Sequence, residues 1–104
     1  MDFELSAEQR LFRDTLRAFV DEQIRPVARE WEAAGRYPDE IVATMRQMGL
    51  FGLTVPEEYG GLAADMVSLA LVFEEISRGW MGVAGILGSH SLSCWMIARY
   101  GTAE

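Results

Sequence analysis

Apolar residues recur at helical spacing in the first third of the chain. Ser6, followed three residues later by Gln9, matches a capping box, in which the two side chains pair with free backbone N–H groups and start a helix. Pro26 lies inside this pattern and lacks a backbone N–H, so we expect a kink or break there, and Gly35 ends the segment. The predicted apolar stripe consists of Phe12, Leu16, Phe19, Val20, Gln23, Ile24, Val27 and Trp31.

A second helix is predicted after Pro38, which suits a first helical turn, as do the two acids that follow it. Gly49 stops this helix. Residues 50–61 show no clean periodicity, and Pro56 together with the two glycines at 60–61 marks them as an ordered loop. The buried face of the second helix is predicted to hold Ile41, Val42, Met45 and Met48.

Two more helices complete the predicted fold. Asp65 is a suitable cap for the third helix, and the fourth runs from about Gly82 to Tyr100, where Gly101 ends it. Because neither a strand pattern nor an internal repeat occurs, we expect one all-α domain over residues 1–104, a bundle of four main helices with the first broken at Pro26. The stripe of the third helix is predicted to be Leu69, Val72, Phe73, Ile76 and Trp80.

The fourth helix is unusual because no residue from Trp80 to Ala98 carries a full charge. A helix that is apolar on all sides is buried in a large protein or in a bilayer. Its serines, glycines and histidine, and the lack of a flanking basic cluster, argue against the membrane. We therefore expect it to pack against protein surface that this chain does not supply, and we expect Glu104 to be a point of truncation.

Small residues recur on one side of this helix, with Gly85, Ser89 and Ser93 at steps of four. Such residues allow close approach of another backbone or of a flat ligand. Periodicity alone favours the simpler interpretation, which is tight packing between helices.

Composition excludes several classes of function. The net charge of −7 argues against binding to nucleic acid or to an anionic membrane surface. The single cysteine, Cys94, has no partner for an internal disulfide, and the first residues lack the pattern of a signal peptide. The sequence therefore predicts a cytoplasmic protein.

The sequence contains no constellation of catalytic, cofactor-binding or metal-binding residues. Glycine loops for phosphate and the GxSxG motif are absent. We expect His90 to be a hydrogen-bonded packing residue, Cys94 to be an inert buried thiol, and the pair Glu74–Glu75 to form a solvated helix edge. The acids at 57–58 lie in the predicted loop and show no sign of a catalytic role.

Four segments in register nevertheless resemble the acyl-CoA dehydrogenase family. LSAEQRLFRDTLRAFVDEQIRPVAREWE resembles its opening helix pair, and YPDEIVATMRQMGLFGLTVPEEYGG resembles the helix and loop that follow. MVSLALVFEEISRG and GSHSLSCWMIARYGTAE resemble the next two helices. Each fragment alone is weak evidence, but four in the family's order are specific, and they indicate the family's amino-terminal helical domain.

The resemblance implies a role in fatty acid metabolism. A flavoprotein oxidoreductase of this family has a middle β-domain and a carboxy-terminal helical domain, which hold most of the FAD contacts and the glutamate base. It converts acyl-CoA to trans-2-enoyl-CoA, passes electrons to electron-transfer flavoprotein or a similar acceptor, and forms homodimers or homotetramers. The resemblance assigns neither a catalytic nor a cofactor-binding residue to this chain, which alone is expected to be inactive.

What the resemblance carries over is a wall of the acyl pocket. In the family, the first half of the corresponding helix lines the channel for the acyl chain. By position, this implies that the substrate-binding residues here are Ala84, Gly85, Gly88, Ser89 and Leu92. Their small size favours a long or bulky acyl group.

Two alternatives remain open at this point. Relatives within the superfamily include flavin oxygenases, oxidases and dehydrogenases of acyl-carrier-protein thioesters, and residues outside this chain distinguish them. A free-standing helical interaction module is the alternative of another class.

Overall fold

The predicted capping box starts the first helix. In the computed structural model, which describes residues 2–104, the Gln9 backbone N–H donates to Ser6 Oγ at 3.1 Å and the Ser6 backbone N–H donates to Gln9 Oε1 at 2.9 Å. Helix α1 then runs over Ala7–Phe19. These two hydrogen bonds satisfy backbone donors that a helix start leaves free.

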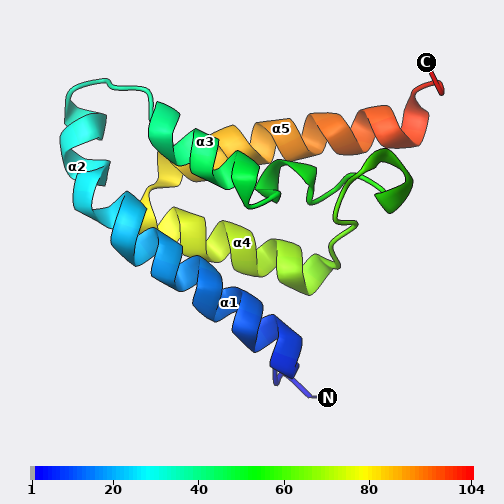
Figure 1. Ribbon diagram of the computed structural model, residues 1–104, viewed down its shortest axis with the longest axis horizontal. Coiled ribbons are helices and arrows are strands. Elements are labelled where there is room, and N and C mark those ends of the chain that lie inside the picture. Colours follow the sequence, from blue (N-terminus) through cyan, green and yellow to red (C-terminus); the bar gives the residue numbers. More distant parts are fainter. Residues whose placement is uncertain (1) are drawn as a thin grey trace.

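The expected kink before Pro26 is confirmed, and it takes the form of a π-helical turn. This turn, η1, spans Val20–Ile24, and α2 follows over Arg25–Ala33 (Figure 1). The Arg25 N–H donates to the carbonyl of Val20, five residues back, and Pro26 has no N–H with which to continue the ladder. The wider turn also shifts the helical register, which leaves Gln23 exposed although the sequence pattern predicted it on the apolar stripe.

Glycines end the next two helices where predicted. Gly35 has a φ of +66° after α2, and the N–H of Arg36 donates to the carbonyl of Trp31 at 2.9 Å. Helix α3 covers Asp39–Gln47, and Gly49 follows it with a φ of +80°. Only glycine adopts these left-handed conformations at little cost.

The loop after α3 is ordered, as predicted. It contains two short 3₁₀ turns, η2 (Leu50–Gly52) and η3 (Glu57–Tyr59). The backbone N–H groups of Leu62, Ala63 and Ala64 donate across the loop to the carbonyls of Gly52, Val55 and Leu53 at distances between 2.8 and 3.0 Å. These paired carbonyls hold both ends of the loop together.

The two remaining helices are consecutive. Asp65 caps α4 (Met66–Gly79) by accepting the Ser68 N–H at 2.7 Å, as the sequence predicted. Trp80, with a φ of −161°, is the single extended residue between α4 and α5, and α5 spans Met81–Tyr100. The structure therefore contains the predicted helices, and no strand occurs within residues 2–104.

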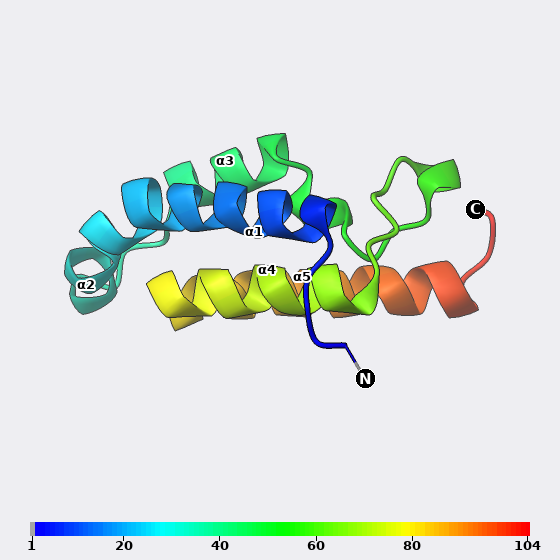
Figure 2. The ribbon, with the colours of Figure 1, turned by 90° about the horizontal axis from the view of Figure 1, so that it is seen from below.

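The helices form two layers. Figure 2 shows α1 and α3 in one layer and α4 and α5 side by side in the other, with α2 at one end. The hydrophobic core lies between the layers and includes residues from all four main helices and the loop. The buried apolar residues of this core are Leu16, Phe19, Val20, Ile24, Ile41, Met45, Leu50, Leu53, Val72, Ile76, Trp80, Val83, Ala84 and Leu87.

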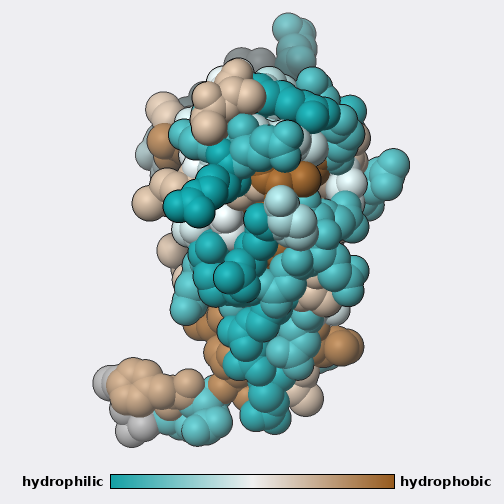
Figure 3. All heavy atoms as spheres, turned by 90° about the vertical axis from the view of Figure 1, so that its left-hand side faces the viewer, coloured by the Kyte–Doolittle hydropathy of each residue, from teal (hydrophilic) through white to brown (hydrophobic). Residues whose placement is uncertain are grey.

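Polar and apolar surfaces lie on different sides of the molecule. The end formed by α2 and the adjoining part of α1 is mostly hydrophilic (Figure 3). Large exposed apolar side chains are instead concentrated on α4 and α5. Hydrophilic residues therefore cover the end formed by α2, while the α4–α5 layer exposes most of the large apolar side chains.

Ser91 is a buried polar residue whose hydroxyl has no hydrogen-bond partner. We expect Ser91→Ala to raise the free energy of unfolding by about 1 kcal/mol, because it removes an unsatisfied buried group and improves helix propensity. Urea denaturation measures this. Ser93→Ala, at an exposed position on the same helix, is the matched control and should change stability by less than about 0.5 kcal/mol. A destabilised Ser91→Ala protein would contradict the prediction.

Candidate functional site

The outward surface of α4 and α5, which we term the α4–α5 outer face, is the main exposed apolar area. Only one side of α5 is buried, and its buried residues are Val83, Ala84, Leu87 and Ser91. Large apolar side chains gathered on one side of a domain are typical of a contact surface. The large exposed apolar residues of the α4–α5 outer face are Met66, Val67, Met81, Leu92, Trp95, Met96 and Tyr100.

The second half of α5 lies largely outside the core. Ser91 is its last buried residue, and from Leu92 onward the helix is flanked by the loop around Tyr59. A hollow of about 360 Å³ lies between this loop and α5, lined in part by Val55, Tyr59 and Ile97. Within residues 2–104, α5 is also the one helix with the length and hydropathy to cross a membrane. Its buried side, however, is part of the domain core.

Four of the five residues predicted to bind the acyl chain reach or border the surface. Gly85, Ser89 and Leu92 are exposed, and Gly88 is half-buried. Ala84 is 6% exposed and packs in the hydrophobic core. The structure thus brings Gly85, Gly88, Ser89 and Leu92 to neighbouring positions on α5, with Ala84 behind them.

The two glycines of this set differ in their surroundings. A Cβ atom placed on Gly85 has no atom within 4 Å, so the space above it is open. A Cβ atom on Gly88 would contact Phe73 Cε1 of α4 at 3.5 Å. Phe73 therefore lies directly beside Gly88, a contact that the sequence pattern did not predict.

This surface suits an uncharged ligand. Among the described residues, no residue between 80 and 98 is charged, so the first half of α5 offers no cation to a phosphate. An aliphatic chain fits because its transfer from water to an apolar surface needs no polar partner.

The prediction that Glu74 and Glu75 form one solvated edge is wrong for Glu75. Glu74 is exposed, but Glu75 is only 2% exposed. Arg17 Nη2 donates to Glu75 Oε1 at 2.8 Å, and Arg78 Nε donates to Glu75 Oε2 at 3.0 Å. The hydrogen bond from Arg17 is the main reason that the pKa of Glu75 lies below its ordinary value.

This network joins α1 to α4. Arg78 Nη1 also pairs with Asp21 Oδ1 at 3.0 Å, and the hydrogen bond from Arg78 is the main reason that the pKa of Asp21 is lowered. Because both Glu75 oxygens are satisfied, the carboxylate tolerates burial. An ionised carboxylate held by two arginines is a poor general base, so we assign Glu75 a structural role.

The prediction that Cys94 is buried is wrong. This residue is partly exposed, and its Sγ lies 3.3 Å from His90 Nε2, one helical turn away. The spacing of four residues was visible in the sequence and places both side chains on one helix face. His90 also packs edge-on against Phe51, with ring centroids 4.9 Å apart, which confirms its predicted packing role.

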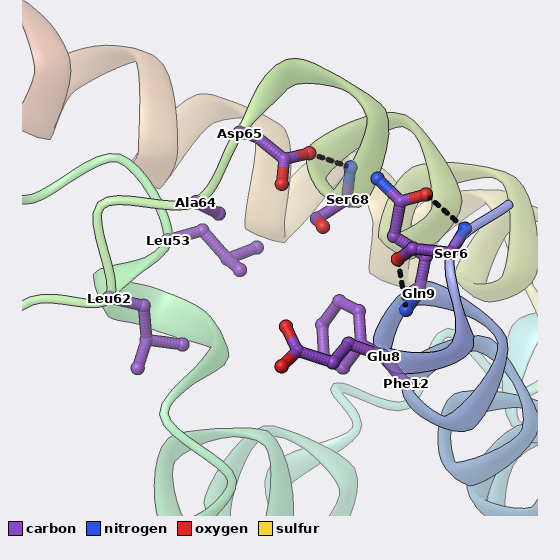
Figure 4. A pocket seen from close by; sticks show the side chains of 9 residues that line it. All are labelled: Ser6, Glu8, Gln9, Phe12, Leu53, Leu62, Ala64, Asp65 and Ser68. Carbon is purple, nitrogen blue, oxygen red and sulfur yellow. Dashed lines mark hydrogen bonds between the residues drawn. The ribbon is translucent and has the colours of Figure 1, made fainter.

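A further hollow of about 280 Å³ lies where α1 and α4 begin (Figure 4). Phe12, Leu53 and Leu62 line its apolar part. The helix starts beside it carry the Ser6 and Asp65 caps, which accept backbone N–H groups of both helices. The hollow therefore has a mixed polar and apolar lining, in which Ser6 and Asp65 already act as acceptors for the helix starts. The sequence pattern alone did not predict it.

Comparison with known proteins identifies the family. The sequence model described as "Acyl-CoA dehydrogenase, N-terminal domain" matches residues 6–104. The (2S)-methylsuccinyl-CoA dehydrogenase of Cereibacter sphaeroides is 44% identical over 84% of this chain, which corresponds to 16% of that protein. The short-chain-specific acyl-CoA dehydrogenase of Clostridium acetobutylicum is 39% identical over the entire chain, which corresponds to 28% of that protein.

A solved structure shares the fold. A chain from work on the electron transferring flavoprotein of Acidaminococcus fermentans superposes with a TM-score of 0.76 and 24% identity, over 97% of this chain and 31% of that one. The present chain therefore spans about a sixth to a third of the proteins it resembles. On the match of its sequence over residues 6–104, it belongs to the acyl-CoA dehydrogenase family and has the fold of that family's N-terminal domain.

Proposed function

We propose that this chain is the acyl-pocket and packing domain of a flavin-dependent acyl-CoA dehydrogenase. The whole protein would oxidise acyl-CoA to trans-2-enoyl-CoA in the cytoplasm as part of fatty acid metabolism. FAD, bound mainly by the family's other domains, would supply the acceptor for the two electrons. Electron-transfer flavoprotein or a similar protein would then receive them, and the assembly would be a homodimer or homotetramer.

The observation that carries this proposal is the exposed, uncharged surface of small residues on the first half of α5. Gly85 leaves open space beside the exposed Ser89 and Leu92, and Phe73 lies beside Gly88. An acyl chain laid on this surface would lose contact with water and need no polar partner. The rest of the α4–α5 outer face would be covered by the domains that hold the flavin.

The acids of this chain are not assigned the role of catalytic base. Glu75 is held by two arginines, and Glu57 and Glu58 are exposed on the η3 turn. Removal of the α-proton is therefore left to the glutamate of the family's carboxy-terminal domain. In this proposal the chain contributes the shape and polarity of the pocket.

Gly85→Leu tests the proposal in the complete flavoprotein. A Cβ atom at this position has no neighbour within 4 Å in this domain, so the fold of the domain should be preserved. We expect kcat/KM for long acyl-CoA substrates to fall about 10- to 100-fold relative to short ones, because a change of a few methylenes in an apolar pocket is worth about 1–3 kcal/mol. Steady-state kinetics over a series of chain lengths measures the shift.

Ala43→Leu is the matched control, since it adds apolar volume at an exposed position of α3 in the other layer. It should leave the chain-length profile unaltered. If Gly85→Leu and Ala43→Leu give the same profile as the unmodified protein, the acyl chain does not lie on α5. The choice of Gly85 follows from the structure, because a large side chain at Gly88 would first displace Phe73.

A further inference from the structure

Helix α5 is joined to the rest of the domain by very few directional contacts. Within the part of the chain that the structure describes, two side-chain hydrogen bonds connect α5 or its N-cap to another element, and no ion pair does. The Trp80 backbone N–H also donates to the carbonyl of Ile76 in the preceding helix α4 at 2.8 Å. The buried residues Val83, Ala84 and Leu87 of α5 contact the core through apolar side chains. Apolar contacts are non-directional, so they resist separation of the helix more than its rotation about its own axis.

The first hydrogen bond fixes the start of α5. Trp80 Nε1 donates to Glu32 Oε2 of α2 at 2.7 Å, and the Trp80 ring packs edge-on against Trp31 with centroids 6.4 Å apart. Trp80 is the N-cap of α5 and is 9% exposed. The indole therefore ties the first turn of the helix to α2.

The second hydrogen bond fixes the middle of α5. Thr54 Oγ1 donates to the backbone carbonyl of Ser91 at 2.7 Å. Thr54 cannot easily follow a moving helix, because the carbonyls of its neighbours Leu53 and Val55 accept backbone N–H groups at 2.8 and 3.0 Å. Ser91 is also the last buried residue of α5.

The proposed acyl surface lies between these two points. Gly85, Gly88 and Ser89 fall in the interval from Trp80 to Ser91, which measures about 16 Å along a helix, and Leu92 follows directly. We propose that Thr54 and Glu32 are positioning residues that set the rotation of α5 and thereby the acyl-chain length that the pocket accepts. This inference rests on the proposed function of the same surface.

The test compares paired variants of the complete flavoprotein. Thr54→Val removes the hydroxyl at constant shape, and Thr54→Ser retains it; Glu32→Leu removes the acceptor, and Glu32→Gln retains one. We expect Thr54→Val and Glu32→Leu to raise the ratio of KM for long to KM for short acyl-CoA substrates about three- to tenfold, the effect of one hydrogen bond. Thr54→Ser and Glu32→Gln should keep the original ratio.

A general loss of folding would lower activity equally at every chain length, and this result would overturn the proposal, as would an unaltered ratio. Gly85→Leu is measured in parallel. If Gly85→Leu shifts the chain-length profile and the Thr54 and Glu32 variants do not, the positioning role of Thr54 and Glu32 is refuted and the acyl surface is retained. If Gly85→Leu leaves the profile unaltered, the acyl surface itself is refuted.

Hydrogen exchange of the complete protein gives a readout independent of substrate. We expect the backbone amides of residues 84–95 to exchange about three- to tenfold faster in Thr54→Val and Glu32→Leu, and at the original rate in the two conservative variants. Unchanged exchange in all four variants would show that these hydrogen bonds do not hold α5.

Discussion

Gly79→Ala should destabilise the domain by about 1–3 kcal/mol, although alanine normally favours a helix. Gly79 is the last residue of α4 and packs against the π-helical turn. A Cβ atom there would lie 2.6 Å from Val20 Cγ1 and 3.0 Å from Ile24 Cγ2. Both neighbours are fully buried and branched at Cβ, so neither side chain can rotate away cheaply. Urea denaturation of the domain measures the loss.

Gly85→Ala provides the control with the same chemical change. No atom lies within 4 Å of the added Cβ, so this substitution should stabilise the domain by about 0.5–1 kcal/mol. The double variant Gly79→Ala with Val20→Ala should lose less than the sum of its single losses, because shortening Val20 removes the closest clash. Equal effects at Gly79 and Gly85 would show that α4 does not approach the π-helical turn so closely.

The second large effect is expected when Glu75 loses both arginines. In Arg17→Ala combined with Arg78→Ala, the carboxylate of Glu75, now 2% exposed, would lose the donors to both of its oxygens. We expect a loss of about 2–3 kcal/mol, below the range for fully buried pairs because both arginines are partly exposed and water can enter. Arg13→Ala, which breaks an exposed pair with Asp14, should cost at most about 1 kcal/mol.

The same network predicts how stability depends on pH. The pKa of Glu75 is lowered in the folded protein, so its contribution is complete above the ordinary value of 4.5 and is lost as the pH falls through the folded pKa. Asp21, whose ordinary value is 3.8, contributes with the same sign. Unfolding measured from pH 6 down to acid should therefore show a decline below about 4.5 that is smaller in the double arginine variant. An equal decline in both proteins would exclude this network as its source.

Local sequence signals predicted most of the secondary structure. The Ser6 and Asp65 caps, the discontinuity at Pro26 and the glycine ends at Gly35 and Gly49 all occur as expected. Each depends on groups within a few residues of one another, which interact in nearly the same way in any surrounding fold. For this reason helix boundaries were predictable without knowledge of the packing.

The candidate site was predictable only in part. The lack of charge on α5 and the small residues Gly85 and Gly88 were evident from the sequence. The contact of Phe73 with Gly88 was not evident, because it depends on how α4 lies beside α5. The hydrogen bond from Thr54 to α5 was also not predictable, because it joins residues 37 positions apart.

By itself, the sequence determined that this chain forms helices, where they begin and end, and that the last of them has too little polar surface to lie alone in water. Only the tertiary structure decided that Glu75 is buried while its neighbour Glu74 is exposed, and that Gly79 is needed for close approach to Val20. The physical reason is the separation along the sequence between the residues that interact. Capping and periodicity act between residues close in the chain, whereas the burial of Glu75 depends on Arg17, 58 residues away, which reaches it only when α1 packs on α4.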